Sequence, residues 1–64
     1  MVKHSALEKH REALREVEMR KQVYQRRVDS QLMSKRDAER KISIMEEIAE
    51  DYRLLADKER LQLV

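Results

Sequence analysis

The most apolar helical face of the chain lies between Ile42 and Ala56. Seven side chains recur there at spacings of three and four residues, which places them on one side of an α-helix: Ile42, Met45, Ile48, Ala49, Tyr52, Leu55 and Ala56. A helix with such a face must bury it against another element. No other segment is hydrophobic enough to enclose it alone, so we expect the chain to associate with a second copy.

A seven-residue repeat runs through the chain in one register. Its a positions are Leu7, Leu14, Lys21, Val28, Lys35, Ile42, Ala49, Ala56 and Leu63, and its d positions are His10, Val17, Tyr24, Gln31, Ala38, Met45, Tyr52 and Glu59. A pattern sustained over so many heptads predicts an all-α fold and a long-helix coiled coil. We treat residues 1–64 as one helical domain, because nothing interrupts the repeat.

Ser5 and Glu8 have the spacing of a capping box, which satisfies free backbone N–H groups in the first turn of a helix. We therefore expect a helix to begin near residue 5. The repeat then predicts one continuous helix to about residue 62.

The segment 29–36 admits a second interpretation. Asp29 and Ser30 are weak helix formers, and Ser34 with Asp37 forms another capping box that would begin a new helix after a short turn. Against a turn stands the absence of Gly and Pro, which most readily supply turn backbone angles. The continuous helix is favoured, and a helical hairpin is the alternative.

The a and d positions together form the seam, the stripe along which paired helices would pack. Two lysines at a positions, Lys21 and Lys35, indicate whether the paired helices run parallel or antiparallel. A parallel dimer would place Lys21 against Lys21 and Lys35 against Lys35. In an antiparallel alignment whose facing positions sum to 59, Lys21 meets Ala38 and Lys35 meets Tyr24, along which the lysine stems can lie. This favours an antiparallel homodimer. A hairpin satisfies the same reversed alignment and would dimerise into a four-helix bundle.

The predicted oligomer interface follows from the seam and its flanks. It consists of Leu7, Leu14, Val17, Tyr24, Val28, Ala38, Ile42, Met45, Ile48, Ala49, Tyr52, Leu55 and Ala56. A further set of apolar residues lies outside the seam and hints at another contact surface: Met19, Leu32, Met33, Ile44 and Leu54.

Composition supports association and introduces a competing function. The chain has 64 residues, 44% of them charged, with no Trp, Phe, Gly, Pro or Cys, which leaves too little apolar surface for a self-contained core.

Residues 20–41 carry eight cations and three acids, a local charge of +5, whereas residues 42–64 carry −3. The cations that could contact a polyanion are Arg20, Lys21, Arg26, Arg27, Lys35, Arg36, Arg40 and Lys41. Acids interrupt this segment and no aromatic stacking platform accompanies it, so nucleic-acid binding is the less favoured function.

Candidate catalytic chemistry is sparse. His4 and His10 lie six residues apart, on different faces of a helix and without a third metal ligand. No serine has a histidine within one turn on its own face, and there is no glycine to form a phosphate-binding loop. We therefore expect neither a cofactor nor a catalytic site.

The expected function is a non-enzymatic protein–protein interaction module that self-associates through an antiparallel coiled coil to scaffold a larger assembly. Its expected partners are itself and, secondarily, another helical protein. No segment approaches the roughly 18 apolar residues of a membrane span, and residues 1–4 lack the apolar core of a signal peptide. The cytoplasm is the default compartment, and no membrane partner is expected.

Overall fold

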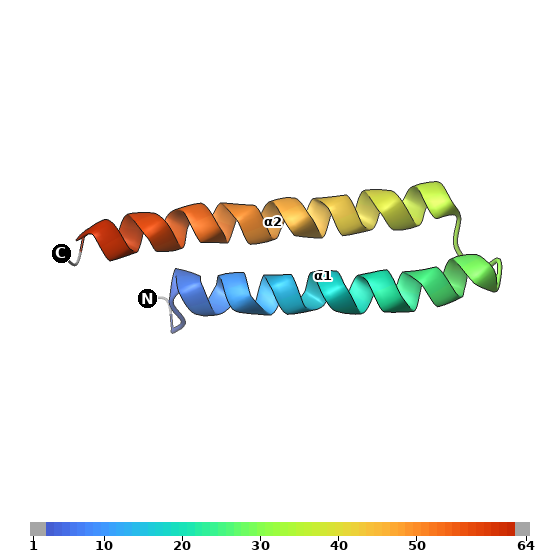
Figure 1. Ribbon diagram of the computed structural model, residues 1–64, viewed down its shortest axis with the longest axis horizontal. Coiled ribbons are helices and arrows are strands. Elements are labelled where there is room, and N and C mark those ends of the chain that lie inside the picture. The colour runs from blue at the N-terminus through green and yellow to red at the C-terminus, as the bar shows by residue number, and fades with distance from the viewer. Residues whose placement is uncertain (1–2, 63–64) are drawn as a thin grey trace.

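The chain folds as a hairpin of two helices that pack against each other (Figure 1). The computed structural model describes residues 3–62, so residues 1–2 and the last two, 63–64, lie outside the description. Helix α1 spans Ala6–Asp29 and helix α2 spans Lys35–Gln62. The described rod measures 50 × 18 × 18 Å. The all-α prediction is confirmed, whereas the continuous helix over residues 5–62 is wrong, because the chain reverses within the segment 29–36.

The reversal follows a helix-ending hydrogen-bond pattern that does not require glycine. The N–H of Leu32 donates to the carbonyl of Arg27 at 2.8 Å, and the N–H of Gln31 donates to the carbonyl of Val28 at 3.0 Å. These two bonds form a Schellman motif, whose residue after the helix cap adopts the left-handed conformation. Gln31 occupies that position with φ 61°. A glutamine thus supplies the backbone angle that glycine most readily adopts.

Serine caps begin both helices, which confirms the serine half of each predicted capping box. The Oγ of Ser5 accepts a hydrogen bond from the N–H of Glu8 at 3.1 Å, and the Oγ of Ser34 accepts one from the N–H of Asp37 at 3.1 Å. The carboxylate of Glu8 pairs with Nδ1 of His4 at 3.0 Å. The Ser34 cap explains why α2 resumes directly after the turn, since it satisfies an otherwise free N–H of the first turn.

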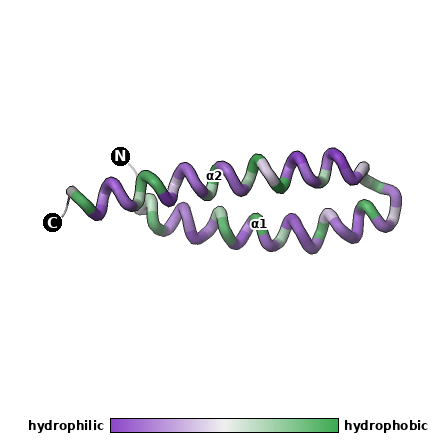
Figure 2. The backbone as a smooth tube through the Cα atoms, turned by 45° about the horizontal axis from the view of Figure 1, so that its top comes forward, coloured by the Kyte–Doolittle hydropathy of each residue, from purple (hydrophilic) through white to green (hydrophobic). Residues whose placement is uncertain are grey.

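The interface between the helices consists mainly of small side chains. The buried residues among those described are Ala6, Ala13, Val17, Ala38 and Ala49. Larger side chains of the seam, such as Tyr24, Ile42, Met45 and Tyr52, are only half-buried. In the described part of the chain no large side chain is fully buried. Hydrophobic and hydrophilic positions alternate along both helices (Figure 2), and the hairpin by itself covers only a narrow apolar stripe.

Candidate interaction surfaces

Three contacts fix how the helices face each other. Nδ1 of His10 donates to the carbonyl of Ala49 at 2.9 Å, which is a pair of positions summing to 59, as the antiparallel alignment predicts. Nη1 of Arg20 donates to the carbonyl of Lys41 at 3.0 Å. The reversed alignment expected between two chains therefore occurs between two helices of one chain.

The third contact places Nζ of Lys9 5.7 Å from the centre of the Tyr52 ring. Lys9 and Arg20 lie eleven residues apart, which is close to three helical turns, so they share one side of α1. Tyr52 and Lys41 are related in the same way on α2. The Lys9–Tyr52 and Arg20–Lys41 contacts therefore mark one side of the hairpin.

Large apolar side chains remain exposed on this side. Met19 and Val23 flank Arg20 on α1, where they line a shallow depression. On α2, Ile48 and Leu55 lie four and three residues from Tyr52, and Ile44 lies three residues from Lys41, so all three share that flank. We call Met19, Val23, Ile44, Ile48 and Leu55 the apolar face. Their side chains are between 38% and 53% exposed.

The opposite side of the hairpin has a different character. Leu14 and His10 of α1 line a depression there together with Glu46 and Glu50 of α2. Leucine side chains on α1 thus lie beside carboxylates on α2. This side is less uniform than the apolar face and more acidic.

Arg53 pairs with two carboxylates of α2, those of Glu50 and Asp57. It donates to Glu50 at 2.6 and 2.9 Å and to Asp57 at 3.1 Å. The hydrogen bond from Arg53 lowers the pKa of the exposed Glu50 carboxyl below its ordinary value, and the same bond raises the pKa of Arg53. The three side chains form a charged network along one helix.

The hairpin gathers the predicted polyanion contacts at its turn end, since residues 20–29 and 35–41 adjoin the reversal (Figure 1). Arg20 pairs with Glu16 at 3.0 Å and Lys21 with Glu18 at 3.5 Å. The remaining six are exposed and make no ion pair within residues 3–62: Arg26, Arg27, Lys35, Arg36, Arg40 and Lys41. Arg27 lies 6.0 Å from the centre of the Tyr24 ring. A continuous helix would have spread these cations along its length.

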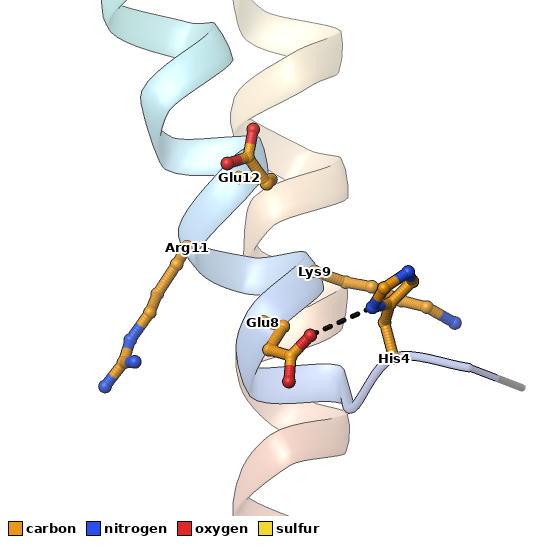
Figure 3. A pocket seen from close by; sticks show the side chains of 5 residues that line it. All are labelled: His4, Glu8, Lys9, Arg11 and Glu12. Carbon is orange, nitrogen blue, oxygen red and sulfur yellow. Dashed lines mark hydrogen bonds and ion pairs between the residues drawn. The ribbon is translucent and has the colours of Figure 1, made fainter.

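A surface depression near the start of α1 is lined by His4, Glu8, Lys9, Arg11 and Glu12 (Figure 3). His4 and Glu8 point toward each other, whereas Arg11 points away from them. The His4 and Glu8 side chains are 67% and 62% exposed, so this pair is open to solvent. Across residues 3–62 no group of three or more His, Cys, Asp or Glu side chains is arranged to hold a metal ion.

The predicted interface residues divide into three groups. Val17, Ala38 and Ala49 are buried between the helices, and Tyr24, Val28, Ile42, Met45, Tyr52 and Ala56 are half-buried there. Leu7, Leu14, Ile48 and Leu55 remain exposed. Ala6 and Ala13 are also buried; they occupy the position of the heptad that flanks the seam, where an antiparallel match places them near Leu55 and Ile48. Leu32 and Leu54, predicted to lie off the seam, are exposed.

Comparison with known proteins adds no relative: no family model, curated protein or solved structure matches the chain. Neither described helix is long and apolar enough to cross a membrane. The interpretation of the surfaces therefore rests on their own chemistry.

Proposed function

We propose that the chain is a non-enzymatic protein–protein interaction module, a helical hairpin that self-associates through its apolar face and thereby joins larger assemblies. The observation that carries this proposal is the exposure of five large apolar side chains on one side of the hairpin, while the buried interface is built from alanine and one valine. Five large apolar side chains therefore remain partly in water.

Energetics favour covering this face. Fully burying a Leu, Ile, Val or Met side chain contributes about 1.5–3 kcal/mol. A hairpin of this size with so small a core is marginal alone, and chains of this kind commonly gain stability from oligomerisation. Two hairpins packed face to face would form a four-helix bundle, with Ile44, Ile48 and Leu55 turned into its interior.

Light scattering of the wild-type chain and of Ile48→Lys tests the proposal. A lysine in the apolar face should give a chain with the mass of a monomer and reduced helicity at low concentration, because the charged group resists burial. Leu54→Lys is the matched control, since Leu54 is an exposed leucine of the same helix and lies outside the apolar face. Equal masses for wild type and Ile48→Lys would overturn the proposal.

Polyanion binding at the turn end is a second candidate function, supported by the six exposed cations without acidic partners in residues 3–62. Each phosphate neutralised by a Lys or Arg releases counterions, so such binding weakens steeply with salt. Fluorescence titration with duplex DNA at two salt concentrations measures it. Arg26→Glu with Arg27→Glu should abolish binding, whereas Arg11→Glu with Arg15→Glu, at the other end of α1, should retain most of it.

A further inference from the structure

The turn between the helices is short and holds one residue in an unfavourable backbone conformation. Only residues 30–34 join α1 to α2 (Figure 1). Within them Gln31 has φ 61°, a left-handed conformation in which the Cβ atom lies too close to the following carbonyl oxygen. No glycine or proline occupies the turn. Short connections under such strain are the ones at which two copies of a chain can exchange helices.

The seven-residue repeat continues through this turn without a skip. Val28 occupies an a position, Gln31 the next d position and Lys35 the next a position. If residues 30–34 were helical, α1 and α2 would therefore form one helix whose apolar stripe stays on a single side. That helix would gain main-chain hydrogen bonds across the former turn, and Gln31 would return to ordinary helical angles.

The contacts between α1 and α2 do not require that both helices belong to one chain. Nδ1 of His10 donates to the carbonyl of Ala49, at positions that sum to 59. Two continuous helices that run antiparallel in the same alignment would form this bond twice, once in each half of the pair. The hydrogen bond from Arg20 to the carbonyl of Lys41 would recur in the same way. Each contact of the hairpin is thus replaced by an identical contact between copies, and only the turn changes.

We propose that two copies of this chain exchange helices, so that α1 of each copy packs on α2 of the other and residues 30–34 continue the helix. The exchanged dimer keeps the contacts between α1 and α2 and relieves the conformation of Gln31. The apolar face takes no part in the exchange, so this inference does not depend on the self-association proposed above.

Charge opposes the exchange at low ionic strength. Two basic doublets adjoin the turn, Arg26 with Arg27 and Lys35 with Arg36. In the exchanged dimer they would meet the same doublets of the second copy at the middle of the rod. Like charges repel there, and salt screens the repulsion. We therefore expect the dimer to tighten severalfold between about 0.05 M and about 0.5 M salt, where charges are screened within a few ångströms.

A distance within one chain distinguishes the exchanged dimer from the hairpin. Arg15 and Ser43 are exposed, and they lie nearly level on neighbouring helices of the hairpin, whose axes are about 10 Å apart. In the exchanged dimer the same positions lie 28 residues apart on one helix, which is about 42 Å. The chain contains no cysteine, so spin labels on Arg15→Cys and Ser43→Cys mark these positions alone.

The labelled chain is refolded at about 0.5 M salt with an excess of unlabelled wild type, so that each dimer carries one labelled copy. Light scattering should give the mass of a dimer, and double electron–electron resonance a separation of about 42 Å. An oligomer with only the short separation would overturn the exchange and leave the self-association of intact hairpins standing. A monomeric mass even at high protein concentration would overturn both.

Position 31 provides a matched pair of variants. Gln31→Gly relieves the left-handed conformation in the hairpin and weakens the continuous helix, so it should reduce the dimerisation constant at least about tenfold. Gln31→Ala keeps the Cβ atom and is the control, because it should dimerise within about threefold of the wild type. Equal dimerisation of the two variants would overturn the exchange, whereas association through the apolar face predicts that equality.

Discussion

The imidazole of His10 and the backbone carbonyl of Ala49 join α1 to α2 through a hydrogen bond of 2.9 Å. The carbonyl can accept this bond in addition to the bond of its own helix, because a carbonyl oxygen has two lone pairs. The donor must be Nδ1 carrying a proton. This partly buried hydrogen bond is thus a directional contact between α1 and α2, in an interface whose buried residues are mostly alanines.

His10→Ala should lower the free energy of unfolding by about 0.5–1.5 kcal/mol, which is the usual net contribution of a hydrogen bond. Urea denaturation followed by circular dichroism at fixed protein concentration measures the change. His4→Ala is the control: the His4 side chain is 67% exposed, and the change should be within about 0.5 kcal/mol. Equal effects of the two substitutions would contradict a specific role for His10.

Ala49 is the most completely buried residue of the interface, with 2% of its surface exposed. Ala49→Leu should destabilise the hairpin by about 1–3 kcal/mol, because added methylene groups force closely packed helices apart. Thermal unfolding measures the loss. Ser43→Leu adds the same side chain on the exposed surface of α2 and should change stability by less than about 0.5 kcal/mol. A tolerated leucine at position 49 would show that the helices are not in close contact there.

Gln31 holds a left-handed conformation with φ 61°. That conformation costs a residue with a Cβ atom roughly 1–2 kcal/mol, whereas glycine loses about 0.5–1 kcal/mol more backbone entropy on folding. Gln31→Gly should therefore stabilise the hairpin by about 0.5–1 kcal/mol, as measured by chemical denaturation. Gln22→Gly, in the interior of α1, should instead destabilise by about 1 kcal/mol. Destabilisation by both substitutions would contradict the left-handed turn.

The sequence pattern predicts where the helices begin better than it predicts where the chain reverses direction. Ser5 and Ser34 cap helices as their spacing from Glu8 and Asp37 indicates, because a cap depends only on neighbouring residues. The sequence does not favour a reversal at Gln31, because it contains neither glycine nor proline, the residues that most readily adopt turn backbone angles. A left-handed glutamine depends on the packing of the whole hairpin, which overrides the local preference.

The candidate surface was also predicted only in part. The heptad frame placed His10 opposite Ala49 correctly, but it grouped Ile48 and Leu55 with the seam residues. Within one hairpin, Ala13 and Ala49 occupy the contact and leave these larger side chains at its edge. The heptad repeat identifies which side of a helix is apolar. It does not identify which part of that side a neighbouring helix covers.

The Glu50–Arg53 pair predicts the acid dependence of stability. The hydrogen bond from Arg53 lowers the pKa of Glu50 in the folded chain below the ordinary value of 4.5. A carboxyl whose pKa is lower in the folded state stabilises that state above its unfolded pKa, and the contribution is lost as the pH falls through the folded pKa. Stability should therefore decline below about pH 4.5.

Glu50→Gln should make the decline below that pH shallower, as measured by urea denaturation at a series of pH values in low salt, where an exposed ion pair is least screened. Glu47→Gln is the matched control, because Glu47 has no ion-pair partner within residues 3–62, and it should retain the wild-type decline. The carboxylate is exposed, so the difference between the two variants should diminish as salt is added. A difference that is insensitive to salt would indicate that Glu50 stabilises α2 through something other than its charge interaction with Arg53.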